Sequence, residues 1–241
     1  MRLEARDISF KYGEGTRQIL NHVTLTVEAG EKVGIMAPSG YGKTTLCKIL
    51  AGYEKPDQGE VLLDGTPIRA FRGYSPVQMV WQHPELSVNP KRRLRTVTAE
   101  GDWSFEDTGE RARIEAELGI RDEWKERFPV EVSGGELQRF CIARALGRRT
   151  KLLIADEMTT MLDLITHDLE LALLTADRVI VLYGGRVVEE TDAAAFQDEK
   201  NLKHPYTKAL FRSMPKNWEK DGEQLCDTGE ILDTMRKEYG R

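Results

Sequence analysis

The chain has 241 residues, of which 40% are apolar, and it carries a formal net charge of −5 at pH 7. This length and apolar content can fill the core of one large α/β domain or two small ones, and they exclude disorder over most of the chain. The acidic balance argues against a general nucleic-acid binder, which usually carries a basic excess, so we expect no nucleic acid among the partners.

The cysteines and the N-terminus indicate a cytosolic protein. Cys47, Cys141 and Cys226 lie far apart without the spacing of metal ligands, and an odd number suits a reducing compartment better than a disulfide scaffold. The N-terminal sequence MRLEARDISF carries charges where a signal peptide needs an apolar core, and no apolar run approaches the ~18 residues of a membrane span. We therefore expect contact with a membrane only through a partner.

An aromatic residue lies between the first two predicted strands. Leu3 to Phe10 and Ile19 to Val27 alternate between apolar and polar residues, which predicts two half-buried strands. Tyr12 lies at the turn between them. Its ring either stacks on a nucleotide base or caps the hairpin as a surface tyrosine, and the sequence leaves both alternatives open.

A glycine-rich loop follows between a strand and a helix. Val33 to Met36 predict a buried strand, and Lys43 opens a helix, whose N-terminal N–H groups and dipole favour an anion. We predict that the residues of the intervening loop wrap their N–H groups around a phosphate: Ser39, Gly40, Tyr41 and Gly42. Lys43 would bridge the β- and γ-phosphates of a nucleotide, and the Thr44 hydroxyl would bind Mg²⁺.

The loop departs from the usual phosphate-loop pattern at one position. In G-x-x-x-x-G-K-[ST] the first residue is a glycine, and here it is Ala37. If this position requires a positive φ, alanine strains the loop. Considered alone, the segment also fits an ordinary strand-to-helix connection, so the prediction of nucleotide binding depends on the rest of the chain.

The next part of the chain leads from strands into a helical segment. Residues 59–65 predict a strand closed by an Asp-Gly turn, and Val77 to Trp81 predict another apolar strand. Gln82 follows directly, where a glutamine can reach Mg²⁺ or an attacking water, although most such glutamines are loop residues. We interpret residues 83–139 as an inserted helical subdomain and its basic run, Lys91 to Arg93, as a solvated face that nearby acidic residues offset.

A second anion-binding helix terminus is predicted at Ser133. Its hydroxyl can cap a helix whose next residues, Gly134 and Gly135, leave their N–H groups open to an anion. This pattern is weak by itself. It precedes a regular helix, Leu137 to Leu146, and then an apolar strand, Leu152 to Ala155, whose end carries charged residues.

Two carboxylates follow this last strand, at the edge where ligands bind in open α/β folds. Asp156 would hold Mg²⁺ through water, and Glu157 would polarise the attacking water. A purely structural role is hard to defend, because an acidic pair at the end of a buried strand needs a partner or a cation. His167 precedes a predicted hairpin at residues 177–189 and is either structural or in contact with a γ-phosphate.

The order of these motifs resembles that of a known family. Tyr12, APSGYGKTT, Gln82, VSGGE, LLIADE, Met161-Leu162-Asp163 and His167 are similar to the motifs of the nucleotide-binding domain of ATP-binding-cassette (ABC) proteins. The resemblance covers residues 1–215 and leaves 216–241 as a tail without a match. It implies an α/β fold, a P-loop NTPase with a RecA-like core, an antiparallel β subdomain and an inserted α-helical subdomain at about 83–139.

The resemblance also implies the roles of individual residues. Those that bind ATP are the adenine-stacking Tyr12, the Walker A residues Ser39 to Thr45, the signature residues Ser133 to Glu136 and the D-loop residue Asp163. The catalytic residues are Lys43, the Q-loop Gln82, the Walker B Glu157 and the switch histidine His167, and Mg²⁺ is held by Thr44, Gln82 and Asp156. Such domains form head-to-tail dimers in which each ATP lies between one Walker A loop and the partner's signature.

Two further stretches narrow the resemblance. Residues 81–90, WQHPELSVNP, and 204–210, HPYTKAL, are similar to the ATPase subunits of oligopeptide, dipeptide and nickel importers. The cysteine cluster that some members carry in the tail is absent, with only Cys226 present.

The resemblance implies a subunit at the cytoplasmic face of the cell membrane that hydrolyses MgATP to drive import. Its expected partners are a second ABC ATPase subunit, as homodimer or heterodimer, transmembrane permease subunits and, indirectly, an extracytoplasmic substrate-binding protein. Two alternatives remain open. One is a non-transport ABC ATPase, for example in phosphonate breakdown, and the other is a degenerate cassette that binds nucleotide only to hold a complex together.

The chain departs from the family where Asp163 is followed directly by Leu164. The family has a helix and a further strand between the D-loop and the switch histidine, and a parallel crossover with its helix needs at least ~10–12 residues. Either this region is rearranged, or a segment is missing from the sequence between these two residues. We predict the second, and a Cα–Cα distance from Asp163 to Leu164 near the ~3.8 Å of a joined peptide would contradict it. A smaller omission near Arg95 and Thr96 would explain why the helical subdomain looks short.

Overall fold

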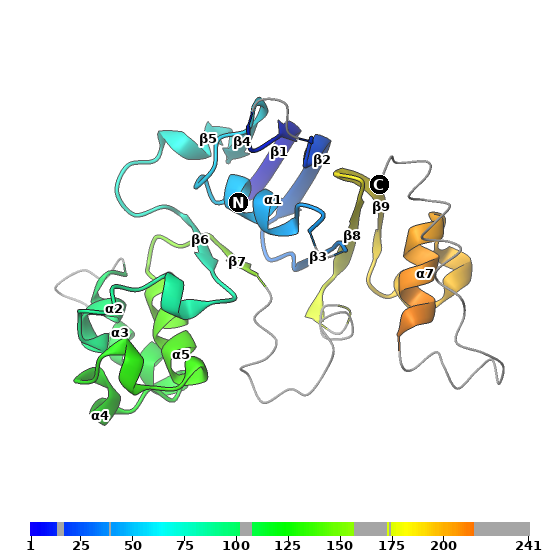
Figure 1. Cartoon of the computed structure of the whole chain (residues 1–241). Helices are drawn as coiled ribbons and strands as arrows, with labels where there is room; N and C mark the ends of the chain where they lie inside the picture. Colours follow the sequence, from blue (N-terminus) through cyan, green and yellow to red (C-terminus); the bar gives the residue numbers. More distant parts are fainter. Residues whose placement is uncertain (14–16, 39, 102–107, 157–172, 174, 215–241) are drawn as a thin grey trace. The chain divides into compact units, whose positions relative to one another are not determined.

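The computed structural model describes residues 1–241 except 14–16, 39, 102–107, 157–172, 174 and 215–241 (Figure 1). The chain divides into two compact units: unit 1 comprises Met1–Ile49, Lys55–Thr66 and Thr166–Arg241, and unit 2 comprises Leu50–Glu54 and Pro67–Ile165. We describe each unit by itself. Within the described ranges, no helix combines the length and the hydropathy that a bilayer crossing requires. The predicted tail at 216–241 lies outside these ranges.

Unit 1 contains an antiparallel sheet with the order β2-β1-β4-β5. Its strands are β1 (Arg2–Phe10), β2 (Leu20–Glu28), β4 (Gln58–Leu63) and the short β5 (Thr66–Pro67). The alternation of buried and exposed residues along β2 follows the period of two that the sequence shows. The strands predicted at 3–10 and 19–27 are therefore confirmed, and they form the predicted antiparallel β subdomain.

Unit 1 also contains a second sheet, in which β3 (Val33–Met36) pairs parallel with β8 (Arg178–Tyr183) and β8 pairs antiparallel with β9 (Arg186–Asp192). The helices whose bounds the described residues of this unit give are α1 (Lys43–Leu50), after β3, and α7 (Pro205–Ser213), drawn in orange in Figure 1. Two short 3-10 helices, η5 (Ala195–Gln197) and η6 (Glu199–Asn201), precede α7. Buried residues from β3, β8, η5 and α7 form one hydrophobic cluster, so α7 is part of the core of this unit.

Unit 2 combines a parallel strand pair with short helices. Its strands are β6 (Val77–Val80) and β7 (Leu152–Ala155), and its helices are α2 (Leu94–Ala99), α3 (Thr108–Glu117), α4 (Asp122–Lys125) and α5 (Gly134–Ala145), with 3-10 turns η1 (Ile68–Ala70), η2 (Pro84–Leu86) and η3 (Pro129–Glu131). A cluster that includes Leu94, Trp124 and Phe140 packs the helices together. Helix α5 begins three residues before the predicted Leu137, because Ser133 caps it and both following glycines adopt helical geometry.

The parallel strands of the described residues belong to two separate sheets. Among the described strands, β3 pairs only with β8, and β7 pairs only with β6. Strand β8 is buried along its last five residues, whereas three of the four residues of β3 are half-buried and Ala155 of β7 is exposed. Parallel strands are usually covered on both faces and paired on both edges, so β3 and β7 have the exposure of edge strands.

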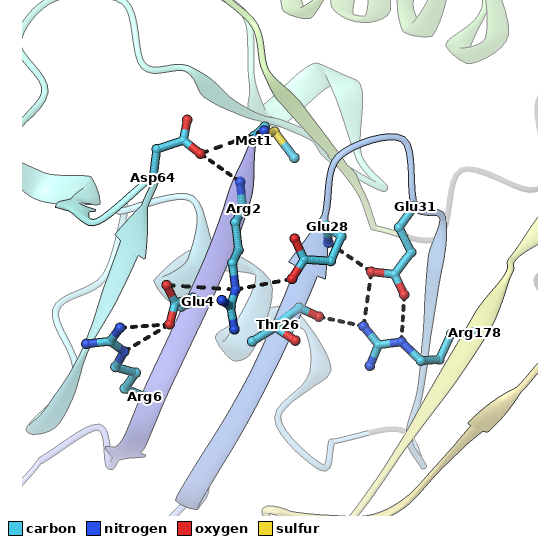
Figure 2. A network of polar contacts seen from close by, with 9 residues as sticks. All are labelled: Met1, Arg2, Glu4, Arg6, Thr26, Glu28, Glu31, Asp64 and Arg178. Carbon is cyan, nitrogen blue, oxygen red and sulfur yellow. Dashed lines mark hydrogen bonds and ion pairs between the residues drawn. The ribbon is translucent and has the colours of Figure 1, made fainter.

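An arginine at the start of β8 ties three segments of unit 1 together (Figure 2). The Arg178 guanidinium donates to both carboxylate oxygens of Glu31, at 2.6 and 3.1 Å, and to the carbonyl oxygen of Thr26 at 2.6 Å. Both charged side chains are largely buried, with 16% and 18% of their surface exposed. The hydrogen bond from Arg178 lowers the pKa of Glu31 from its ordinary value of 4.5. This bidentate ion pair fixes β8 against the turn that leads from β2 into β3.

We predict that Arg178→Met lowers the free energy of unfolding by about 2–4 kcal/mol at pH 7, because Glu31 keeps its charge and loses its partner. A carboxylate with a lowered folded pKa stabilises fully above its unfolded pKa, and this contribution is lost as the pH falls through the lower folded value. Urea denaturation should therefore show the difference between variant and native protein shrinking as the pH falls below the 4.5 that is ordinary for Glu31.

The control for this prediction is Arg2→Met in the same network. Arg2 is 53% exposed and pairs at 3.1 Å with Glu28, which is 57% exposed (Figure 2). Exposed ion pairs contribute less than about 1 kcal/mol, so this variant should unfold almost like the native protein. Equal losses from the two variants would show that burial does not distinguish the two pairs.

Candidate nucleotide-binding site

The predicted phosphate loop is a tight turn that leads from β3 into α1. Gly40 and Gly42 have positive φ values of 77° and 92°, and the Tyr41 N–H donates to the Pro38 carbonyl oxygen at 3.2 Å. A Cβ atom at Gly42 would lie 2.9 Å from Ile19 Cγ2, so no side chain fits there without a shift. A Cβ at Gly40 would meet no atom within 4 Å. The loop therefore leads into the helix N-terminus at Lys43, and the space next to Gly40 is open.

Ala37 does not strain this loop. Among the described residues other than glycine, a positive φ occurs only at Asp7, His22 and Asp64. Ala37 therefore does not have the positive φ that would favour glycine at this position. The departure from the usual glycine is compatible with a formed phosphate loop.

Tyr41 has a contact that the sequence did not predict. Its ring centroid lies 5.2 Å from that of Tyr183, the last residue of β8. The sequence predicts only that the Tyr41 backbone N–H helps to surround a phosphate. The only local signal was the size of this side chain among small neighbours.

Tyr12 lies beside the first turn of α1. Its hydroxyl is 3.2 Å from the hydroxyl oxygen of Thr45, and its ring meets the Phe10 ring edge-on at a centroid distance of 4.9 Å. The side chain is 53% exposed. A ring that is held at its edge and at its hydroxyl, and is otherwise open to solvent, offers a rigid surface on which a base can stack.

The predicted cap at Ser133 is formed. The Ser133 hydroxyl accepts a hydrogen bond from the Glu136 N–H at 3.3 Å, and a Glu136 carboxylate oxygen accepts one from the Ser133 N–H at 2.7 Å. The hydrogen bond from the Ser133 N–H lowers the pKa of Glu136 most, and the hydrogen bond with the Ser133 hydroxyl lowers it further. Ser133 and Gly134 are exposed, and a Cβ on Gly135 would meet no atom within 4 Å. The N-terminus of α5 is thus uncrowded in unit 2, as an anion site requires.

Gln82 and Asp156 follow neighbouring parallel strands of unit 2. Val80 of β6 pairs with Ala155 of β7, and the Asp156 N–H donates to the Val80 carbonyl oxygen at 3.1 Å. Both side chains therefore start at the same edge of the strand pair. Asp156 is 4% exposed, whereas Gln82 is exposed. A carboxylate buried at a strand end suits a hard cation such as Mg²⁺, so this edge fits the predicted metal site.

The structure brings some predicted site residues together and does not describe others. In unit 1, Tyr12 lies beside the helix that follows the phosphate loop, and in unit 2, Gln82 and Asp156 share a sheet edge. The predicted residues Ser39, Glu157, Asp163 and His167 lie outside the described residues, as does the connection from Asp163 to Leu164.

Comparisons with known proteins identify relatives of the chain. Residues 20–160 match the family model described as ABC transporter. The chain is 35% identical to the nickel import ATP-binding protein NikE of Rhodospirillum rubrum, with 87% of each chain covered. It is 32% identical to the dipeptide transport ATP-binding protein DppF of Lactococcus lactis, over 87% of this chain and 79% of that protein.

A solved structure has the same fold. The dimeric post-hydrolysis state of the ATP-binding cassette MJ0796, bound to ADP and Pi, superposes with a TM-score of 0.67 at 26% identity, covering 79% of this chain and 98% of that one. This likeness confirms the predicted fold of a P-loop NTPase.

The alignment with the Rhodospirillum rubrum protein also shows that this chain is shorter within the matched region. The alignment has 246 positions, but the part of this chain that it covers, 87%, is only about 210 residues. About 36 positions of the alignment therefore have no counterpart in this chain.

The family model covers more than half of the chain, and the relatives exceed 30% identity over most of their length. The chain therefore belongs to the ABC transporter family.

Proposed function

We propose that the protein is the ATP-hydrolysing subunit of an ABC importer for peptides or for nickel or metal chelates. The observation that carries the proposal is the phosphate loop APSGYGKTT, which turns into α1 in a chain that is 35% identical to a nickel import ATP-binding protein. Similar proteins named for nickel import and for dipeptide transport favour this over the non-transport alternative, such as phosphonate breakdown.

Binding of ATP would use the residues predicted to bind the nucleotide and those predicted to hold Mg²⁺. Tyr12 stacks on the adenine, the N–H groups of the loop and of α1 surround the phosphates, and Lys43 neutralises the charge that develops on them. Thr44, Gln82 and Asp156 would hold Mg²⁺, which when bound neutralises the phosphate oxygens. Glu157 polarises the attacking water, and His167 contacts the γ-phosphate.

The predicted ATP site is divided between the phosphate loop of one subunit and the signature residues of another, and the proposed partners follow from this division. The signature residues Ser133 to Glu136 would bind the ATP held by a second ABC ATPase subunit, identical or homologous, in a head-to-tail dimer. The similar cassette MJ0796 is dimeric in its solved structure, which supports this arrangement. Transmembrane permease subunits would place the protein at the cytoplasmic face of the cell membrane, with an extracytoplasmic binding protein contacted indirectly.

A degenerate cassette that binds nucleotide without hydrolysing it is the second candidate. Ala37 no longer favours it, because this residue does not have the positive φ that would require glycine. The direct connection from Asp163 to Leu164 does favour it. In the family, a crossover with a helix and a strand lies between the D-loop and the switch histidine, and here too few residues are left for it before His167.

Replacing Tyr12 tests base stacking. We expect Tyr12→Ala to weaken ATP binding about 5- to 150-fold, because stacking of a base on an aromatic ring contributes ~1–3 kcal/mol. Tyr12→Phe keeps the ring and should retain most of the affinity. Calorimetric titration with ATP and with inorganic tripolyphosphate separates base from phosphate binding, and an equal loss for both ligands would contradict a stacking role.

Replacing Glu157 tests hydrolysis. In the complex with its permease partners, Glu157→Gln should bind ATP with native affinity and release phosphate about 10²- to 10⁴-fold more slowly, because the amide cannot accept a proton. Glu60→Gln, an exposed carboxylate of β4, is the control and should hydrolyse ATP at the native rate. Undiminished phosphate release from the Glu157 variant would refute its assignment.

Restoring the connection distinguishes the two candidates. We expect that inserting, between Asp163 and Leu164, a helix and strand of the kind that the ABC family has between the D-loop and the switch histidine raises the melting temperature and increases ATP hydrolysis about tenfold or more. A Gly/Ser linker of equal length is the control, because it spans the distance without forming a strand. If the inserted chain gains stability without hydrolysis, the degenerate cassette is the better reading.

A further inference from the structure

Three tyrosines from distant parts of the chain stack in series in unit 1. Tyr41 of the phosphate loop lies 5.2 Å from Tyr183 at the end of β8, and Tyr183 lies 4.6 Å from Tyr206 of α7, measured between ring centroids. The ring planes are inclined to each other by 34° and 38°, so both pairs are tilted aromatic contacts. The phosphate loop is therefore in aromatic contact, through one ring, with the helix that the HPYTKAL stretch forms.

The far end of this series is buried and the near end is not. Tyr183 and Tyr206 are 1% and 4% exposed, whereas Tyr41 is half-buried. The same hydrophobic cluster contains Met36, the last residue of β3. The phosphate loop is thus packed at its start through Met36 and near its end through Tyr41, in both cases against a cluster to which α7 contributes.

Helix α7 is itself fixed to the sheet. Glu189 of β9, which is 8% exposed, accepts hydrogen bonds from the N–H groups of Lys203 and His204 at 2.7 and 2.9 Å. The His204 ring nitrogen Nδ1 accepts from the Tyr206 N–H at 3.2 Å and caps the helix. The backbone that carries Tyr206 is therefore held by hydrogen bonds to Glu189 and to the His204 ring, so the Tyr206 ring can act as a support.

We propose that Tyr206 is a positioning residue for ATP binding, which through Tyr183 holds Tyr41 and the phosphate loop in the shape that receives the phosphates. The inference rests on the proposed function. A glycine-rich loop loses conformational freedom when it closes on a ligand, and a loop that is already ordered loses less. Removing the support weakens binding of ATP and of its transition state alike, which raises KM and leaves kcat nearly unchanged.

The test compares variants that remove the ring with one that keeps it. Tyr206→Leu should raise the KM for ATP about fivefold with little change in kcat, and Tyr206→Phe should restore the native KM, since stacking does not require the hydroxyl. Tyr41→Leu, made from the other end of the series, should raise KM similarly. The double variant should lose no more than either single one, because the two residues act through one contact series.

Leu210→Ala is the matched control. Leu210 lies on the same helix, is partly buried and packs against the same cluster, but contributes no ring. It should lower the melting temperature as Tyr206→Leu does and leave KM for ATP unchanged. The proposal is overturned if this control raises KM as much, if Tyr206→Phe fails to restore KM, or if the two leucine variants are additive.

The outcomes separate this inference from the proposed function. A native protein that neither binds nor hydrolyses ATP with its permease partners would refute the function itself. A native protein that hydrolyses ATP, with an unchanged KM in a folded Tyr206→Leu variant, would refute only the positioning role. If Tyr206→Leu does not fold, Tyr41→Leu decides, because Tyr41 is half-buried at the edge of the cluster.

Discussion

The pairing of parallel strands is the constraint on which this molecule depends. A buried strand must satisfy its N–H and C=O groups on both edges, and the loops at its carboxyl end take their position from it. Strand β3 carries the phosphate loop and β7 carries Asp156, yet each has one strand neighbour among the described residues. Their half-buried side chains fit this incomplete pairing.

Strand β8 is the one strand that pairs with β3 among the described residues, and it is held in place at both of its ends. Its first residue, Arg178, holds Glu31 and the turn that enters β3, and its last residue, Tyr183, lies in the aromatic series that reaches the phosphate loop. Between these ends, β3 follows β8 in register from Val33 to Met36. The shape of the phosphate loop therefore depends on one strand that is held by a charge pair at its start and by aromatic packing at its end.

Sequence patterns predicted the local elements and missed the contacts between distant ones. The bounds of β3 and β7 follow directly from short apolar runs with turn residues on either side. Arg178 and Glu31 are 147 positions apart, and no periodicity links them. The roles of the site residues came from resemblance to a family, because a strand end with a carboxylate specifies a cation site but no reaction. Whether Ala37 strains the loop needed the backbone angle, which no residue type reveals.

The groups proposed to bind ATP and those proposed to hydrolyse it lie in different parts of this chain. The groups proposed to hold the nucleotide, Tyr12 and the loop before α1, lie on elements of unit 1 that are paired and packed. The groups proposed to activate water, Glu157 and His167, stand ten positions apart in the sequence, on either side of the step from Asp163 to Leu164. A crossover of a dozen or more residues ordinarily separates two parallel strands, so we expect a shortened connection to act first on the alignment of these two proposed groups. Misalignment of catalytic groups lowers kcat while ground-state binding persists, so we expect a shortened connection to weaken hydrolysis before it weakens nucleotide binding.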